Sequence, residues 1–354
     1  MISPMPAPTS HFRRGMTLAE LMVVVAIIGL LAVTVLPALS ATAELRRGRE
    51  AARMVSSFIA KAQSRAIGRR EWSGFQLVAT GATSYAALDL VLADVPAVYR
   101  GDTVPALVVI SGTPGATQRT VTGTLSSADV FHPSGTASIS SGDLVSFDST
   151  GPVYEIVSLT ANTLTFKLRG HDANASEDAG NQLHNTPWPP PNAALSFEVI
   201  RQPAASGSPV SMADGRVVDL YWSGYGPPTA NGGNAYITLP NATAGSFPNR
   251  TTVVFDGTGR LRQVVTTGTA MLRKTVTGPL FLLIGRADRV ITGTAYVANP
   301  SDDTIGANWQ YSDSHWVAID PLTGVAKSAE CMASGTTVIE SQYWIRQALL
   351  AGGN

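Results

Sequence analysis

The sequence is short of charge and of cysteine. Only 14% of its 354 residues are charged, and 25 basic side chains balance 25 acidic ones to a formal net charge of zero. This balance gives no overall electrostatic reason to bind nucleic acid, and we expect no nucleic-acid partner. The single cysteine, Cys331, excludes an intrachain disulfide and leaves a free thiol or an intermolecular bridge as alternatives.

Motifs for catalysis and metal binding are also missing. The five histidines are scattered, and the chain has no Cys-x-x-Cys pair, phosphate-binding glycine loop or Gly-x-Ser-x-Gly motif. Two acidic stretches, residues 172–178 and Asp302-Asp303 near Asp313, are reminiscent of calcium loops, but the first lacks the turn glycine and the closing glutamate. We therefore expect no enzyme activity and no cofactor, with calcium as the one metal to consider.

What the sequence does contain favours a β-rich exported protein. Gly and Pro together number 55, and short β-like runs alternate with turn residues after Arg70. The length is sufficient for two or three domains.

The N-terminal region combines a basic leader with a long apolar run. Residues 13–20 read RRGMTLAE, and the next nineteen, residues 21–39, carry no charge. Because a helix rises 1.5 Å per residue, nineteen residues span about 30 Å, the thickness of a bilayer core. The run therefore predicts a membrane-spanning helix.

Two ordinary explanations account for only part of this region. A secretory signal peptide has a shorter apolar run and is cut after it, although residues 38–41 do offer small side chains there. A plain single-span anchor explains the length of the run but not the carboxylate of Glu20 at its edge. An acid there is costly unless it finds a partner.

Cleavage after Gly15 would supply that partner. It creates a new α-amino group on Met16, one helical turn before Glu20. Neutralisation between this amine and Glu20, in the same or a neighbouring subunit, removes the cost of the buried carboxylate.

These residues resemble the type IV pilin and type II secretion pseudopilin family. The family leader ends in glycine and is followed by a Thr-Leu-x-Glu-Leu pattern and a Val/Ile-rich helix, here residues 15, 17–21 and 23–29. Met16 replaces the commoner Phe, and Ala19 replaces the commoner Ile. The resemblance covers about residues 11–40.

The resemblance implies a processing route and an assembly role. A prepilin peptidase would cut between Gly15 and Met16 and methylate the new amine, and Glu20 would be the assembly residue. Gly29 and Pro37 occupy the positions of the family's helix-loosening glycine and proline. The implied partners are the peptidase, other pilin or pseudopilin subunits, the inner membrane and the assembly platform.

Charge counting does not fix the membrane orientation. The leader arginines would stay on the cytoplasmic side, as the positive-inside tendency expects. Four more arginines follow the other end of the run, at residues 46, 47, 49 and 53. We rely on the cleavage pattern, which places the head in the periplasm or outside and later in a filament.

An amphipathic helix is expected to continue from the apolar run to Arg70. Its apolar stripe consists of Leu45, Ala52, Val55, Ile59, Ala62 and Ala66, widened by Met54 and Phe58. Pro37 should kink or loosen the helix. The basic residues 46–70 predict a solvated face, or else contact with lipid headgroups or acidic patches.

Several runs resemble a subfamily, the H-type minor pseudopilins (GspH) and their pilus counterparts (FimT). The runs are residues 62–67, 215–220, 254–260 and 316–325.

The predicted fold is α+β, a long helix packed on a mostly antiparallel β-sheet head with an inserted β subdomain. The domains are a leader at 1–15, a helix at 16–70 with its transmembrane half at 16–40, a head at 71–330 and a tail at 331–354. The insert is expected at about 96–191 and ends at the Trp188–Pro191 linker; one larger sheet is the alternative. The expected strands are 75–79, 86–92, 106–110, 143–147, 153–159, 163–168, 195–200, 217–222, 236–239, 252–255, 261–265, 280–284 and 316–319. The last helix is expected at 338–350, packed on the sheet or free to offer Trp344 to another subunit.

The predicted function is a structural, non-catalytic filament subunit. Its length favours a minor component over the bulk subunit, and the choice between pilus and secretion pseudopilus is open. The alternative is a membrane-anchored exported enzyme or carbohydrate-binding protein with a pilin-like anchor, in which some of the six tryptophans line a ligand surface.

Overall fold

The computed structural model describes residues 18–81, 85–111, 120–125, 131, 139–168, 188–212, 215–226, 237–239, 250–267, 271–290, 306–332 and 338–351. Within these ranges it does not describe the side chains of residues 32–41 or of a few residues at strand ends. The chain divides into two units, Met1–Arg47 and Gly48–Asn354.

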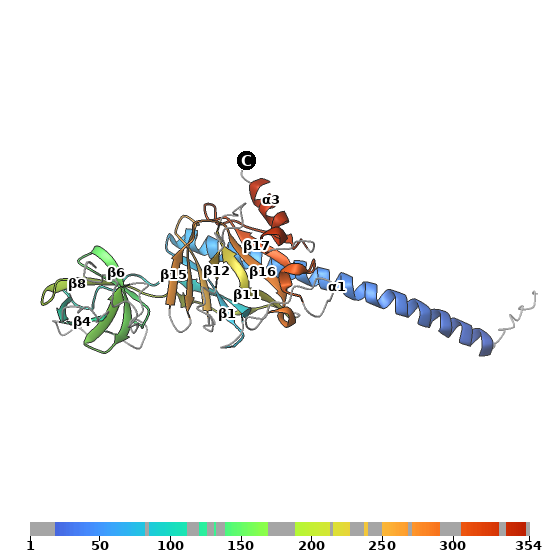
Figure 1. Ribbon diagram of the computed structural model, residues 1–354, viewed down its shortest axis with the longest axis horizontal. Coiled ribbons are helices and arrows are strands. Elements are labelled where there is room, and N and C mark those ends of the chain that lie inside the picture. Colours follow the sequence, from blue (N-terminus) through green and yellow to red (C-terminus); the bar gives the residue numbers. More distant parts are fainter. Residues whose placement is uncertain are drawn as a thin grey trace, which may run out of the picture. The chain divides into compact units, whose positions relative to one another are not determined.

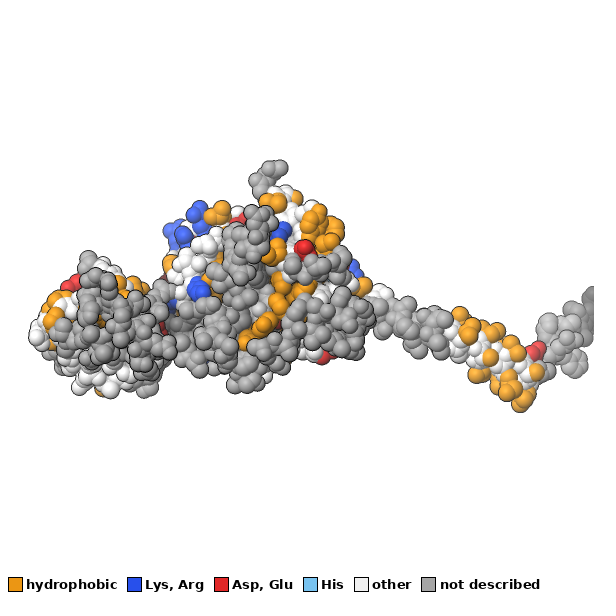
Figure 2. All heavy atoms as spheres, in the orientation of Figure 1, with side chains coloured by type: hydrophobic (Ala, Val, Ile, Leu, Met, Phe, Trp, Pro, Cys, Tyr) orange, Lys and Arg blue, Asp and Glu red, His pale blue; other side chains and the backbone are white. Residues whose placement is uncertain are grey.

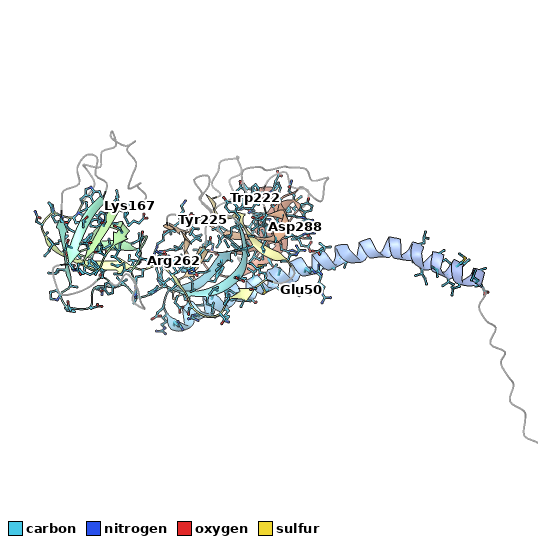
Figure 3. The ribbon with its side chains drawn as sticks, turned by 90° about the horizontal axis from the view of Figure 1, so that it is seen from below. Glu50, Lys167, Trp222, Tyr225, Arg262 and Asp288 are labelled. Atoms are coloured by element: carbon cyan, nitrogen blue, oxygen red, sulfur yellow. The ribbon has the colours of Figure 1, made fainter. Side chains whose placement is uncertain are left out.

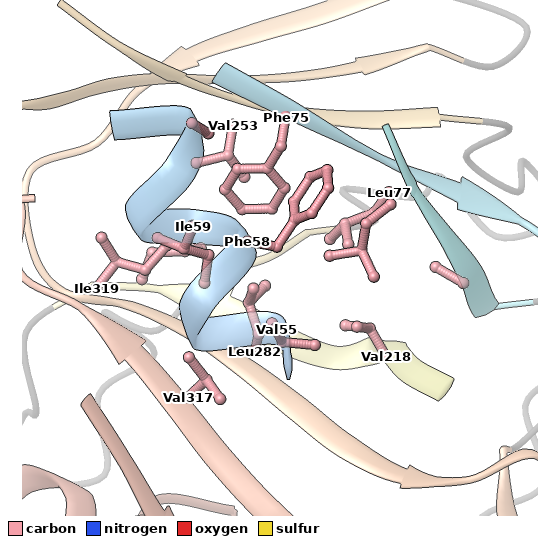
Figure 4. Packing of buried hydrophobic residues seen from close by; sticks show 14 of the residues in the cluster. Val55, Phe58, Ile59, Phe75, Leu77, Val218, Val253, Leu282, Val317 and Ile319 are labelled. Carbon is pink, nitrogen blue, oxygen red and sulfur yellow. The ribbon is translucent and has the colours of Figure 1, made fainter. Parts of the chain in front are cut away.

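Helix α1 (Leu18–Arg69) is continuous and contributes to both units. In the second unit its apolar stripe is buried as predicted: Ala52, Val55, Ile59, Ala62 and Ala66 are at most 1% exposed. Figure 4 shows Val55, Phe58 and Ile59 pointing into a cluster supplied by the strands of the large sheet. Burial of this stripe holds the second half of α1 on the sheet, since apolar area removed from water contributes about 25 cal/mol per Å².

The large sheet has twelve strands, and every pairing in it is antiparallel. Its main order is β15-β14-β13-β1-β2-β11-β16-β17-β18, with β9, β10 and β12 paired beside this path (Figure 1). The strands on the main path are β1 (Ser73–Ala79), β2 (Ala86–Asp94), β11 (Arg216–Tyr225), β13 (Arg250–Phe255), β14 (Leu261–Thr267), β15 (Met271–Thr275), β16 (Leu280–Arg286), β17 (His315–Ile319) and β18 (Ala326–Glu330). The short strands are β9 (Ala204–Ala205), β10 (Val210–Ser211) and β12 (Ile237–Thr238).

Both faces of the sheet are covered at β16 and β17. Alternate residues such as Leu282 and Val317 join the core with α1, whereas Phe281 and Trp316 join a second cluster on the opposite face. That cluster includes Ile345 of α3 (Tyr343–Ala351) and Trp309 of the 3-10 turn η4 (Asn308–Gln310). The predicted C-terminal helix therefore packs on the sheet, but a turn at Gln342 divides it into α2 (Val338–Ser341) and α3. A second 3-10 turn, η3 (Ala287–Arg289), follows β16.

Six other strands close into a separate barrel of order β3-β4-β7-β6-β5-β8. They are β3 (Leu107–Ser111), β4 (Thr120–Leu125), β5 (Leu144–Phe147), β6 (Thr150–Leu159), β7 (Thr163–Leu168) and β8 (Ala194–Ile200). The barrel has its own apolar core. Trp188 stacks on Tyr154 with ring centroids 5.6 Å apart, and β8 follows it, so the stretch expected to end the insert as a linker packs into the barrel instead.

The predicted α+β architecture is confirmed at the level of a helix followed by a mostly antiparallel head. All thirteen predicted strands overlap observed strands, while β4, β9, β10, β15 and β18 were not predicted. The alternative of one larger sheet is wrong, because β3–β8 form a barrel of their own. The assignment of the barrel as an insert within the head stays a prediction.

Candidate functional site

Residues 18–31, at the start of α1, present large apolar side chains all round. Leu18 is 78% exposed, and nine large hydrophobic side chains from Leu21 to Leu31 are 43–72% exposed. These nine are Leu21, Met22, Val23, Val24, Val25, Ile27, Ile28, Leu30 and Leu31. Figure 2 shows hydrophobic side chains along the visible side of this part of the helix, with an acidic one near its start. A helix that is apolar on every side needs lipid or protein around it.

Glu20 lies in the first turn of this helix. A carboxylate at this end is favoured by the helix dipole, whose N-terminus carries a partial positive charge. Gly15 and Met16, the predicted processing residues, lie outside the described residues, so the cleavage between them and the pairing of the Met16 amine with Glu20 stay predictions.

The two predicted helix-loosening residues both lie within α1. A Cβ built on Gly29 would meet nothing within 4 Å, so no contact inside this chain requires glycine there. The helix is assigned through Pro37 without interruption, and the side chain of Pro37 is not described. The expected weakening of the helix at these residues stays a prediction.

Among the described residues, no helix combines the length and the apolar character needed to cross a membrane. The transmembrane half expected at 16–40 stays a prediction.

Helix α1 meets the head closely at Gly48. A Cβ on this residue would lie 2.2 Å from the carbonyl oxygen of Asp313 and 3.1 Å from Nδ1 of His315, so only glycine fits. Asp313 itself receives two arginines: its Oδ1 is 2.9 Å from Nη1 of Arg289, and its Oδ2 is 3.3 Å from Nη2 of Arg216. Arg216 is 1% exposed, so Asp313 and its two arginines form a largely buried charged cluster in the head.

The end of α1 is tied to the head by charge. Arg65 donates from Nε and Nη2 to the two carboxylate oxygens of Asp94, at 2.9 and 2.5 Å, and Arg69 adds a contact of 3.1 Å. Burial alone would raise the pKa of Asp94, but the hydrogen bonds from Arg65 and Ser206 hold it below its usual value. The predicted basic face is therefore not wholly solvated, since two of its arginines pair with this carboxylate.

A buried carboxyl group that sequence reasoning missed lies in the centre of the sheet. Asp219 on β11 is fully buried and accepts hydrogen bonds from Nδ2 of Asn308 at 2.9 Å and from the backbone N–H of Tyr221 at 3.1 Å. Burial raises its pKa to about 7, against these hydrogen bonds. In the sequence it is one Asp in a run that reads as an ordinary strand, and nothing there signals its burial.

The residues considered for metal or thiol chemistry do not form a site in the described part of the chain. No group of three metal-binding side chains occurs among the described residues, and the stretches 172–178 and 302–303 lie outside them. Cys331 is a free thiol, 3% exposed, and burial raises its pKa well above the usual value. Its burial disfavours the intermolecular bridge.

The six tryptophans do not gather on one ligand surface. Trp309 and Trp316 are at most 2% exposed, whereas Trp72 and Trp344 are 41% and 50% exposed on different elements. Figure 3 labels Trp222, which packs edge-on against Trp309 with centroids 6.0 Å apart. The four rings other than those of Trp72 and Trp344 lie in or against the apolar clusters of the barrel and the sheet.

Comparison with known proteins finds one match. The family model for the prokaryotic N-terminal methylation motif matches residues 11–36, which include Gly15, Met16, Glu20 and Gly29. This motif is the signature of prepilin peptidase substrates and supports a type IV pilin-like N-terminal segment. No curated protein and no solved structure matches the chain.

Proposed function

We propose that this chain is a structural subunit of a type IV pilus or a type II secretion pseudopilus. One observation carries the proposal: a methylation motif leads into a helix whose large apolar side chains are exposed all round, with one carboxylate in its first turn. Such a helix needs a lipid environment before assembly and sister helices after it. The rest of the chain folds into a head that carries no recognised catalytic motif.

The proposed route starts in the inner membrane. Prepilin peptidase cuts after Gly15 and Met16 is methylated; the subunit waits with its head in the periplasm or outside and then enters the filament. There the Met16 amine of one subunit neutralises Glu20 of the same or a neighbouring one, which sets the register of the helices.

Two experiments test this route. Intact-mass measurement of the membrane-extracted protein should give a chain that starts at methylated Met16. Retention of residues 1–15 would favour a plain anchor, and a start near Thr42 would favour secretion. Glu20→Ala should block incorporation into filaments while cleavage continues, whereas Glu50→Ala, a matched change on the exposed face of the same helix, should assemble normally. Normal assembly of the Glu20 variant would refute the register role.

We further propose a minor rather than a bulk subunit, most like the GspH and FimT proteins. The support is the added six-stranded barrel, which makes the head larger than helix packing alone requires. Immunogold labelling should mark filament ends; labelling along whole filaments would contradict this assignment.

A further inference from the structure

His315 lies where α1 enters the head. It begins β17, and its ring packs beneath the α1 backbone, since a Cβ on Gly48 would be 3.1 Å from Nδ1 and 3.2 Å from Cε1. The division between the two units of the chain falls at the same place, between Arg47 and Gly48. The imidazole is thus one of the first head groups that α1 touches.

The imidazole is buried with little polar support. It is 3% exposed, and neither ring nitrogen makes a hydrogen bond of good geometry within the described part of the chain, although the carbonyl of Asp313 lies close enough to favour a proton there. The hydroxyl of the adjacent Ser314, which is fully buried, also lacks one among the described residues. A neutral ring tolerates such a place far better than a charged one, because burying a charge without a partner is expensive.

Three charged groups, each on a different element, and one backbone carbonyl face the ring. Arg216 on β11 and Arg49 on α1 oppose a proton there, whereas Glu330 on β18 and the Asp313 carbonyl in the preceding turn favour it. Burial is the largest effect, and together these groups lower the pKa of His315 below its usual value. The ring is therefore neutral at neutral pH and takes up a proton only in acid.

The turn at Asp313, which contacts α1, has little freedom to adapt. Arg216 and Arg289 both bind the Asp313 carboxylate, and the backbone oxygen of Asp313 leaves no room for a side chain on Gly48. A charge on His315 favours the entry of water, and a hydrated ring needs more space; α1, which lies against the ring at Gly48, can supply it by shifting.

We propose that His315 is an acid-sensitive contact that releases the α1 backbone at Gly48 from the head when its imidazole is protonated. The release is local: it affects the turn of α1 around Gly48 and leaves the stripe from Val55 to Ala66 in place. The device belongs to the head and does not depend on processing at Gly15.

Amide hydrogen exchange of the full chain in lipid nanodiscs tests this inference. After correction for intrinsic exchange rates, protection of amides 46–54 should fall at least tenfold between pH 7.5 and pH 5, while amides 59–66 stay protected. His315→Phe keeps a flat ring that cannot take up a proton, so the protection of amides 46–54 in this variant should not depend on pH. Equal acid loss in this variant, no loss in the wild type, or simultaneous loss at 59–66 would overturn the inference.

Two further variants test the inference while keeping His315 itself. Glu330→Gln removes a carboxylate that favours the proton and should move the transition to lower pH. Arg49→Gln removes an opposing cation and should move it to higher pH. If the pH midpoints for loss of amide protection in the two variants do not differ from the wild type, or shift in the same direction, the proposed role of His315 is contradicted.

Discussion

Arg65 of α1 holds Asp94 at the end of β2 through two hydrogen bonds, 2.9 Å from Nε to Oδ1 and 2.5 Å from Nη2 to Oδ2. Nη2 also lies 2.7 Å from Oγ of Ser206, which directly follows β9. Because β2 and β9 pair at Asp94 and Ala204, one guanidinium fastens the strands that lead into and out of the barrel. The helix thus braces the head at this crossing.

The geometry of this contact predicts that lysine cannot replace Arg65. An ammonium group cannot make two parallel hydrogen bonds to one carboxylate, so Arg65→Lys should lower the free energy of unfolding by about 1 kcal/mol. Denaturant unfolding of the full chain measures the change. Lys61→Ala, on the exposed part of the same helix, serves as the control and should leave stability unchanged; an equal loss in both would show that the paired geometry does not matter.

Replacing a glycine of α1 by alanine should change the stability in opposite directions at Gly48 and at Gly68. Gly48→Ala places a methyl group 2.2 Å from the Asp313 oxygen and should cost about 1–3 kcal/mol, as overpacked sites do. Gly68→Ala meets nothing within 4 Å and should gain about 0.5–1 kcal/mol, because alanine favours the helix. Thermal unfolding should lower Tm for the first and raise it or leave it unchanged for the second. Similar Tm values for the two variants would contradict the close contact at Gly48.

The elements that could be predicted from sequence are those with strong local patterns. The stripe from Ala52 to Ala66 has helical spacing, and strands such as β7 and β16 are rich in branched and aromatic residues. Of the proposed assembly site, the sequence supplied the motif at Gly15 to Glu20, while the exposure of the following helix needed the structure.

The missed elements depend on tertiary contacts. Strand β4 reads Thr-Val-Thr-Gly-Thr-Leu, and Gly123 interrupts its local pattern; a Cβ there would lie 2.5 Å from Cγ1 of Val108, so the glycine allows a close packing contact that the sequence does not reveal. Strand β18 reads Ala-Lys-Ser-Ala-Glu and becomes a strand by pairing with β17. The burial of Asp219 and the contact between Gly48 and His315 join residues far apart in sequence, which local patterns do not reveal.

Asp219 predicts a loss of stability as pH rises. Its pKa is about 7 in the folded chain, above the value of an ordinary Asp, so the folded state holds the proton more tightly than the unfolded state. The stability from this proton is complete below about pH 3.9, falls as pH rises to about 7 and is constant above that. Since one pKa unit equals about 1.4 kcal/mol, the change should amount to a few kcal/mol.

Asp219→Asn tests this linkage, because an amide does not titrate. Urea unfolding at pH 4.5, 6 and 8 should show the wild type losing stability relative to the variant as pH rises, with no further change above pH 8. The absolute stability of the variant can also drop, since one of its amide hydrogens faces a donor, and so the slope with pH is the readout. A slope unchanged in Asp219→Asn would assign the pH dependence to other groups.

The pairing of β2 with β9 predicts that the barrel can be removed without loss of the sheet. Asp94 and Ala204 are direct neighbours across these antiparallel strands, so the 107 residues from 96 to 202 leave and return at adjacent points. A short flexible Gly-Ser linker can join such neighbours without the N–H that Pro203 lacks. Joining Val95 to Pro203 by this linker also keeps the hydrogen bond that the carbonyl of Pro203 accepts from Nε2 of Gln76.

The shortened chain should retain a cooperative thermal transition within several degrees of the original Tm. The lost contacts with the sheet include the hydrogen bond from Arg273 to the carbonyl of Arg201, while the α1 core and the contact between Arg65 and Asp94 remain. Residues 96–202 expressed alone should also fold, because the barrel is closed and has its own core. If the shortened chain shows no cooperative transition while the separate barrel folds, the head depends on the barrel for its stability and the two are not independent domains. If both fold, the barrel is a module carried by a head that is complete without it, and its contribution to the proposed assembly can be tested by deletion alone.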